Sequence, residues 1–271
     1  MPISARDFEF MSVWLRQRIG LTLTPDKTYL VETRLEPVAR THGFADLEAL
    51  VSALRAPFIA DALLRDVTDA MTTHESMFFR DMKPFEILER EVFPALRAQQ
   101  ATSVRIWCAA CSSGQEPYSI AMLLSEKPNL IGGMRVEIIG TDISDKVVER
   151  AKTGVYSQFE VQRGLPIHYL IKYFEQRPGN QWEVKPSIKS MVQFGTLNLL
   201  EPYGFSHKFD IVLCRNVLIY FDEDTKIAVL NRIAGVTQPP GYLFLGASES
   251  VMGLSHRWRS HATVHGLSLM A

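Results

Sequence analysis

Val104-Arg-Ile-Trp-Cys-Ala-Ala-Cys-Ser-Ser-Gly-Gln-Glu-Pro-Tyr-Ser-Ile-Ala121 combines a strand, a loop of small residues and the beginning of a helix. Ile106 and Trp107 give the first part the apolar, β-favouring character of a buried strand. Residues 109–114 are small enough to let a ligand approach the backbone closely. Pro117 suits the first turn of a helix, because its missing N–H costs nothing there. A strand, a loop and a helix in this order form the first unit of a nucleotide-type α/β site.

The bulk composition narrows the class of protein. The chain has 271 residues, of which 46% are hydrophobic and 22% charged, so it can fold as one large domain or two modest ones. The net charge of −1 argues against a general nucleic-acid binder. No apolar run reaches membrane-spanning length, and the first residues lack the pattern of a signal peptide. Three cysteines fit reduced thiols, so we expect a cytoplasmic protein. From the charge and the apolar runs, we expect no nucleic-acid partner and no direct membrane insertion.

The first hundred residues show only helical periodicity. Ser4-Ala-Arg-Asp7 resembles a capping box at the start of a first helix, and Gly20 is placed to end it. Thr24-Pro25 predicts the start of a second helix, and a fourth is expected over roughly residues 58–71. Without any strand candidate, this part is predicted to be a small helical domain.

Three cations, Lys27, Arg34 and Arg40, follow one another on the second predicted helix. A solvated helix face is the default interpretation of such a pattern. The alternative is a positive surface that meets an acidic partner helix. The sequence leaves both interpretations open.

A polar segment, Thr72-Thr-His-Glu-Ser-Met-Phe-Phe-Arg80-Asp, follows the helical part. One interpretation is a linker whose Phe78 and Phe79 fill the core. The other places Arg80 in a cleft between two domains. The next helix, from Pro84 to about Ala98, contains Pro94, which predicts a kink or a late break.

The remainder of the chain alternates strands with helices, which predicts a largely parallel sheet in an α/β fold. After the strand at Val104, the expected strands are Arg135–Asp142, Ser190–Leu197, Phe209–Cys214, Gly241–Gly246 and a last one within residues 260–269.

One segment, between Tyr156 and Thr196, does not fit this alternation. Two helix-like pieces precede Gln181–Val184 and the stretch from Ile188 onward, and Pro178-Gly179-Asn180 is a turn signal. We expect a small antiparallel insertion there, at about residues 165–195. The predicted domains are residues 1–75, which are helical, and residues 76–271, which contain the sheet and its insertion.

Polar groups follow three of the predicted strands, where ligands bind in open α/β sheets. The loop Ser112-Ser113-Gly114 offers backbone N–H groups and is followed by Glu116. Asp142 ends the second strand, where a carboxylate can accept both hydroxyl hydrogens of a ribose. Asn198 follows the third strand, where it can meet a base edge. Together and in this order, these groups indicate an adenosine-containing ligand.

The first loop discriminates between ligands of that kind. It lacks the Gly-x-Gly-x-x-Gly spacing that places a pyrophosphate on a helix N-terminus. Glu116 would repel a phosphate and is better matched to a cationic amino-acid tail. This favours S-adenosylmethionine over NAD.

Other chemistries have weaker support. Cys108-Ala-Ala-Cys111 resembles a thioredoxin-type motif, but Ser-Ser-Gly separates the second cysteine from the helix and so disfavours activation by the helix dipole. The seven histidines are scattered without paired ligand spacing, so no metal site is predicted. No hydrolase motif is present.

Five motifs together resemble the CheR family, the chemoreceptor protein-glutamate O-methyltransferases of bacterial chemotaxis. They are Thr72–Arg80, Cys111–Ala121, Gly140–Ser144, Asn198–Leu200 and Arg215-Asn-Val-Leu-Ile-Tyr-Phe221. The resemblance covers nearly the whole chain. It implies S-adenosylmethionine as methyl donor, S-adenosyl-L-homocysteine as product, and glutamates on the cytoplasmic methylation helices of chemoreceptors as acceptors. The implied fold is a Rossmann-like class I methyltransferase domain with a small antiparallel β-subdomain insertion, preceded by an all-α N-terminal domain.

The resemblance also assigns roles to residues. It implies cofactor contacts from His74, Ser76, Arg80, Glu116, Asp142, Asn198, Leu199, Arg215 and Asn216. Arg80 and Tyr220 are the family's candidates for lining the methyl-transfer site. His74 and Ser76 depart from the Asn and Thr of the better-known enteric members.

A further departure concerns the acceptor. Family members that tether to a receptor's C-terminal pentapeptide use an extra glycine-containing loop in the β-subdomain. The turn at Arg177-Pro-Gly-Asn-Gln181 is short. We therefore expect direct, pentapeptide-independent recognition of the methylation helices, and we expect a monomer.

The chemistry of methyl-ester formation is simple. A glutamate has a pKa of about 4.3, so it is ionised at neutral pH and needs no general base. Alignment of oxygen, methyl carbon and sulfur can supply roughly 7–11 kcal/mol. Two alternatives remain open: a class I methyltransferase that acts on another substrate, and a non-catalytic cofactor-binding module.

Overall fold

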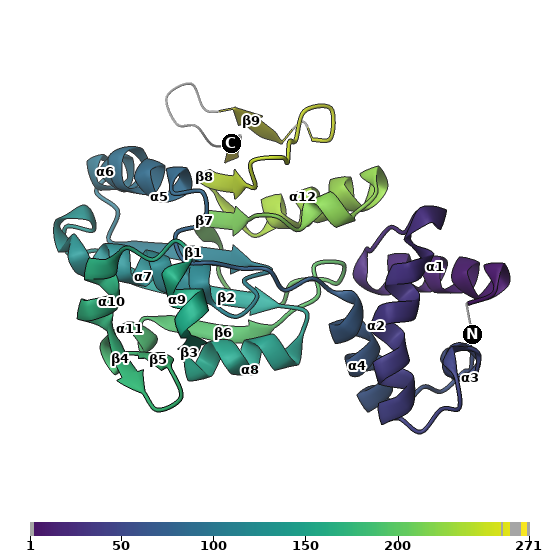
Figure 1. Cartoon of the computed structure of the whole chain (residues 1–271). Helices are drawn as coiled ribbons and strands as arrows, with labels where there is room; N and C mark the ends of the chain where they lie inside the picture. Colours follow the sequence, from purple (N-terminus) through teal and green to yellow (C-terminus); the bar gives the residue numbers. More distant parts are fainter. Residues whose placement is uncertain (1–2, 256, 261–266, 270–271) are drawn as a thin grey trace.

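The computed structural model describes residues 3–255, 257–260 and 267–269. A group of helices near the N-terminus lies beside a larger α/β part, and the carboxyl ends of the central strands point toward it (Figure 1). The helical group consists of α1 (Ala5–Ile19), α2 (Thr28–Thr41), α3 (Leu47–Leu54) and α4 (Asp61–Met71). In the described part of the chain, no helix is long and apolar enough to cross a membrane.

The helical group has a core of its own, made by the apolar faces of its helices. As predicted, α1 begins where Ser4 Oγ accepts the N–H of Asp7 and ends at Gly20, which has a left-handed φ of 76°. α2 begins later than predicted, because Pro25–Lys27 form a 3₁₀ turn before it. α4 also begins later, at Asp61.

The segment after α4 enters the α/β core. Phe78 and Phe79 are buried, with 0% and 3% exposure, which confirms that these aromatic rings fill the core. The following helix is interrupted, since α5 (Lys83–Ile87) passes into a π-helical turn (Leu88–Val92) and then into α6 (Phe93–Ala98). Pro94 lacks the N–H that would continue the regular pattern, so the predicted irregularity lies in the turn before it.

The main sheet has seven strands in the described residues, in the order β6-β2-β1-β7-β8-β10-β9. Its strands are β1 (Ser103–Ala109), β2 (Arg135–Asp142), β6 (Val192–Thr196), β7 (Phe209–Cys214), β8 (Thr237–Leu245), β9 (Trp258–Ser260) and β10 (Leu267–Leu269). β6, β2, β1, β7 and β8 pair in parallel, and β10 and β9 add to the edge antiparallel. The predicted last strand within residues 260–269 is confirmed by β10, and the structure adds the short strand β9 before it, while residues 261–266 lie outside the described residues.

Both faces of the sheet are covered by helices, as in a Rossmann-like fold. Alternate residues of a strand point to opposite faces, and in β1 this places Ile106 in one buried cluster and Trp107 in the other. The helices are α7 (Gln115–Glu126), α8 (Asp145–Thr153) and α12 (Glu223–Gly235), with 3₁₀ turns at Pro128–Leu130 and Leu218–Tyr220. The strand order reverses between β1 and β7, the point at which such sheets bind ligands.

A second, three-stranded antiparallel sheet has the order β3-β5-β4. This inserted part comprises β3 (Val155–Ser157), α9 (Gln158–Gln162), α10 (Ile167–Tyr173), β4 (Phe174–Arg177), β5 (Gln181–Val184) and α11 (Pro186–Lys189). It begins earlier than the predicted insertion, because three-residue β3 is too short to give a periodic signal. The stretch after Ile188 does not pair with β5. It enters β6, which belongs to the main sheet.

Candidate functional site

A cleft lies between the helical group and the carboxyl ends of β1, β2, β6 and β7. Its larger cavity encloses about 1180 Å³, including the part open to solvent, which is enough for a nucleoside-sized ligand. A smaller cavity adjoins it and shares Ser112, Arg215 and Asn216 with it. We call the two cavities together the interdomain cleft. Its walls on the helical side include Ile19, Leu21, Thr22, Leu23, Lys27, Leu30 and Arg34.

The interdomain cleft brings together every site residue predicted from the sequence. The larger cavity is lined by His74, Asp142, Asn198, Leu199 and Tyr220. The smaller one is lined by Ser76, Arg80 and Glu116, and both are lined by Arg215 and Asn216.

The loop after β1 has an unusual backbone. Ala110, Ser112 and Gly114 have φ values of 54°, 51° and 90°, in the left-handed region. At Gly114 a Cβ would lie 2.9 Å from Ala151 Cβ and 3.0 Å from the Phe194 ring, so a side chain has no room there. Small residues therefore allow both the turn and its close packing on the neighbouring helix and strand.

Asp142 is a buried carboxylate at the end of β2. Its Oδ2 accepts the backbone N–H of Ser112 at 2.8 Å, and its Oδ1 accepts that of Ser144 at 3.1 Å. Burial raises the pKa of Asp142, because the carboxylate loses hydration, and the N–H donors oppose this effect. The remaining lone pairs of both oxygens are suited to hydroxyl donors.

An ion-pair cluster centred on the buried Arg215 lies beside this carboxylate. Arg215 Nη1 donates to Glu116 Oε2 at 2.6 Å, and Nη2 donates to Asp81 Oδ2 at 2.7 Å. Nη2 also donates to the carbonyl oxygen of Arg80 at 2.8 Å. Burial alone would lower the pKa of Arg215, but Glu116 and Asp81 raise it overall. The guanidinium therefore stays charged and holds the loop that carries Arg80.

That loop is strained. Phe79, Asp81 and Met82 have φ values of 50°, 66° and 46°, and such left-handed residues cost roughly 1–3 kcal/mol each. The N–H of Phe79 donates to Ser119 Oγ at 2.9 Å, and its ring lies 4.8 Å from that of Tyr169. This packing compensates for the strained backbone. Arg80, which lies among these three residues in the chain, faces the cleft.

Two predicted residues also join the helical group to the sheet. Asn198 Nδ2 donates to the carbonyl oxygen of Arg18 at 2.9 Å, so its amide holds the end of α1. The carbonyl oxygen of Tyr220 accepts the N–H of Thr22 at 2.9 Å. The position of the helical group is therefore coupled to the site.

Comparison with known proteins identifies the chain. Residues 74–266 match the model of the CheR methyltransferase SAM-binding domain, and residues 6–72 match that of the CheR methyltransferase all-alpha domain. The chain belongs to the CheR methyltransferase family. A "Chemotaxis protein methyltransferase 1" of Pseudomonas aeruginosa is 43% identical, over 96% of this chain and 95% of that protein. "Chemotaxis protein methyltransferase Cher2" of Pseudomonas putida is 42% identical, over 93% of both chains.

As a CheR methyltransferase, the chain has S-adenosylmethionine (SAM) as its cofactor, and the cleft fits this molecule. Asp142 offers carboxylate oxygens for ribose hydroxyls at the end of β2. Arg215 Nε is buried and has no hydrogen-bond partner among the described residues. Buried donors are normally satisfied, and the carboxylate of the SAM amino-acid tail would satisfy this one.

Sequence reasoning missed Glu249, which lies outside the cleft and supports a loop that lines it. Its Oε2 accepts the backbone N–H of Asn216 at 2.8 Å and that of Gly246 at 2.6 Å, and its Oε1 accepts that of Ile219 at 3.3 Å. Glu249 therefore ties the loop after β7 to the loop after β8. An acidic residue soon after a strand that ends in glycine was the only available signal.

The two cysteines of the first motif differ in position, since Cys111 lines the smaller cavity and Cys108 lines neither cavity of the cleft. Cys108 and Cys111 are buried and unpaired. Burial raises the pKa of both thiols well above the usual value, so they remain protonated. They serve as small packing residues beneath the loop.

Proposed function

We propose that this chain transfers the methyl group of SAM to glutamate side chains on the cytoplasmic methylation helices of chemoreceptors. The products are glutamate methyl esters and S-adenosyl-L-homocysteine. The observation that carries the proposal is the interdomain cleft, which gathers Asp142, the Glu116–Arg215 pair, Arg80 and Tyr220 between the two domains of a CheR methyltransferase. The names of the relatives, chemotaxis protein methyltransferases, supply the receptor context.

Different residues of the cleft bind different parts of the cofactor. Asp142 holds the ribose hydroxyls, and Asn198 with Leu199 borders the adenine. Glu116 attracts the ammonium of the amino-acid tail, since only one of its oxygens bonds to Arg215. His74, Ser76 and Asn216 complete the cofactor wall, and the free Nε of Arg215 takes the tail carboxylate.

Methyl transfer to a carboxylate needs no proton transfer. The acceptor glutamate, with an ordinary pKa of about 4.3, is already ionised at neutral pH. SAM supplies an electrophilic methyl carbon on a sulfonium. A carboxylate oxygen forms the new O–C bond while the C–S bond breaks. The electron pair of the C–S bond returns to sulfur. Arg80 and Tyr220 orient the acceptor carboxylate along this line, and such positioning can supply roughly 7–11 kcal/mol.

The helical domain and the small sheet would meet the receptor. The turn Pro178–Asn180 between β4 and β5 is short, which favours direct recognition of the methylation helices over a pentapeptide tether. The protein would act as a cytoplasmic monomer.

A transfer assay tests the proposed reaction. The protein is incubated with SAM labelled in the methyl group and with a cytoplasmic chemoreceptor fragment or RNA. The expected result is a base-labile label on the receptor fragment, as a methyl ester requires. A base-stable label on RNA would overturn the proposal in favour of another class I methyltransferase. Calorimetric binding of S-adenosyl-L-homocysteine without any transfer would indicate a non-catalytic module.

A further inference from the structure

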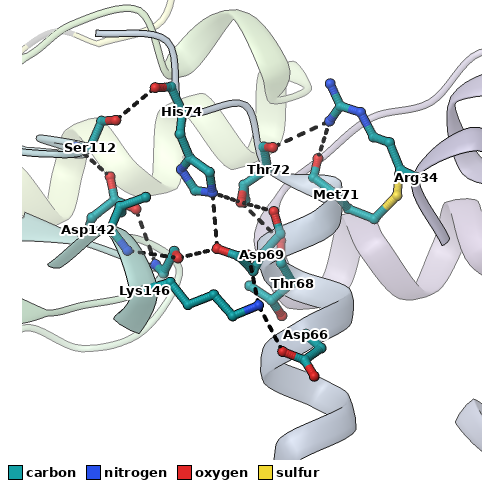
Figure 2. Close-up of polar contacts among 12 residues, drawn as sticks. Arg34, Asp66, Thr68, Asp69, Met71, Thr72, His74, Ser112, Asp142 and Lys146 are labelled. Atoms are coloured by element: carbon teal, nitrogen blue, oxygen red, sulfur yellow. Dashed lines mark hydrogen bonds and ion pairs between the residues drawn. The ribbon is translucent and has the colours of Figure 1, made fainter. Parts of the chain in front are cut away.

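Helix α4 of the helical domain carries a carboxylate, Asp69, that contacts the α/β domain directly. Asp69 Oδ1 accepts the hydroxyl of Ser144 at 2.5 Å, although the two residues are 75 positions apart. The same oxygen lies 3.3 Å from His74 Nε2 in the segment between the domains. Figure 2 shows the Asp69 carboxylate directed toward the His74 ring.

These contacts continue to Asp142. Ser112 Oγ donates to the carbonyl oxygen of His74 at 2.9 Å, and the Ser112 N–H donates to Asp142 Oδ2 at 2.8 Å. The Ser144 N–H donates to Asp142 Oδ1 at 3.1 Å. The contacts form a closed ring, Asp69–Ser144–Asp142–Ser112–His74, and Figure 2 labels every member except Ser144. Ser112 and Ser144, which donate backbone N–H groups to Asp142, thus each have a hydroxyl that bonds to the interdomain segment or to α4.

The ring is buried at Ser112, Asp142 and Ser144 and half-buried at Asp69 and His74, and neighbouring charges face Asp69. Ser112 and Ser144 are 6% and 3% exposed, and hydrogen bonds away from water are stronger and more sensitive to a missing partner. Lys146 Nζ lies 3.2 Å from Asp69 Oδ2 and 3.0 Å from Asp66 Oδ1, so it pairs with two carboxylates one helical turn apart. Asp66 also lies 2.8 Å from His42 Nε2.

Other contacts fix the segment between the domains. Thr72 Oγ1 lies 2.9 Å from His74 Nε2 and donates to the carbonyl oxygen of Thr68 at 3.0 Å. Arg34 Nη1 donates to the carbonyl oxygen of Met71 at 2.9 Å (Figure 2). The cation Arg34 therefore binds the end of α4. On the second predicted helix, this cation serves a contact within the protein.

We infer that Asp69 is a positioning residue for the cofactor site: it orients Asp142 through Ser144 and His74. Asp69 does not touch the cofactor. It fixes the direction of the two backbone donors, which in turn fix the carboxylate oxygens that receive the ribose. This inference rests on the proposed role of Asp142. A carboxylate suits position 69, because it accepts from the Ser144 hydroxyl and faces Lys146, whereas an amide would turn a donor toward one of them.

Asp69→Asn tests the inference, and Asp66→Asn is the matched control on the same helix with the same lysine partner. Three quantities are measured: S-adenosyl-L-homocysteine affinity by calorimetry, the melting temperature without ligand, and kcat and KM for SAM. Asp69→Asn is expected to weaken binding by about tenfold, as loss of an orienting partner commonly does. KM should rise while kcat at saturating SAM changes little. Asp66→Asn should bind as the unaltered protein does.

A second variant keeps the test informative if Asp69→Asn folds poorly. Ser144→Ala removes the same ring contact from the other domain and is expected to weaken binding by a similar factor. The double variant should bind no more weakly than either single variant, because both break one path. The inference is overturned if Asp69→Asn and Asp66→Asn bind equally well, or if the Asp69 and Ser144 effects simply add.

A separate variant distinguishes failure of this inference from failure of the proposed site. Asp142→Ala should abolish measurable binding. If it binds normally, the assigned ribose contact is wrong. If Asp142→Ala loses binding while Asp69→Asn and Ser144→Ala keep it, the site stands and only the positioning role of Asp69 is overturned.

Discussion

Arg215 donates a 2.6 Å hydrogen bond from Nη1 to Glu116 Oε2, although the two residues are 99 positions apart in the chain. Glu116 lies in the first turn of α7 after β1, and Arg215 follows β7, so the pair bridges the point where the strand order reverses. The side chains are 2% and 12% exposed, so water screens their charges little. The pair therefore stabilises the fold at this point, and the proposed function assigns it cofactor contacts as well.

Arg215→Ala should destabilise the protein strongly. It leaves Glu116 as a buried carboxylate without its cation, and breaking such a pair typically costs about 3–5 kcal/mol. Urea unfolding at neutral pH measures the change. The double variant Glu116→Gln, Arg215→Met should recover much of the loss, since it removes both charges. A single variant within about 1 kcal/mol of the unaltered protein would contradict this account of the pair.

Gly114→Ala separates backbone strain from crowding. Gly114 and Gly133 both have a φ of 90°, but a Cβ has contacts under 3.4 Å only at Gly114, and nothing lies within 4 Å of it at Gly133. Each substitution, Gly114→Ala or Gly133→Ala, should lower the free energy of unfolding by about 1–2 kcal/mol through left-handed strain. Gly114→Ala should cost about 1–3 kcal/mol more, because the added methyl overpacks the contact with Ala151. Equal losses in urea unfolding would show that the loop can relax.

Glu249→Gln should weaken the site by loosening the loops that Glu249 holds together. Glutamine can present only one oxygen to the N–H groups of Asn216, Gly246 and Ile219, so at least one of the three loses its acceptor. We expect a loss of about 1–3 kcal/mol in stability and weaker S-adenosyl-L-homocysteine binding. Calorimetry and thermal melting measure the two effects. The exposed Glu175 provides the control, and Glu175→Gln should change neither.

The stability that the contact between α1 and α12 contributes should depend on pH. Asp222 accepts the N–H of Thr225 at 2.9 Å and pairs with Arg16. A hydrogen bond from the Thr225 side chain is the largest cause that lowers the pKa of Asp222 below 3.8, followed by the Thr225 N–H and then by Arg16. A lowered pKa means that the ionised form stabilises the fold above pH 3.8 and that this gain is lost as the pH falls through the folded-state pKa.

Asp222→Asn keeps a capping side chain and removes the charge, so it isolates this effect. At pH 7 it should lower the free energy of unfolding by about 0.5–1 kcal/mol. The difference from the unaltered protein should shrink below pH 4. Urea unfolding at several pH values measures it, and a difference that stays constant down to pH 2 would contradict the assignment.

The parts that follow local rules could be predicted from the sequence. Ile106 and Trp107 mark β1 because a buried strand is apolar, and Asp142 is recognisable as the polar residue that ends β2. Their meeting at one edge follows from parallel pairing. The family resemblance then supplied Arg80 and Tyr220, which no periodicity marks.

The remaining features depend on contacts distant in sequence. The left-handed Asp81 and Met82 hold their conformation only because Arg215 and the packed aromatic rings support the loop. Glu249 acts on a neighbouring loop, and β3 exists only because β5 pairs with it. No local pattern encodes such partners, so the structure was needed to find them.

The hydrogen bond between Asp69 and Ser144 has a consequence for how such proteins diverge. One partner lies in the domain that would face the receptor, and the other lies in the domain that holds the cofactor. Recombination that imports a new helical domain must import an acceptor at position 69 that suits the resident serine and lysine. With the inferred role of Asp69, exchange of the helical domain is therefore expected to alter cofactor affinity as well as receptor contacts.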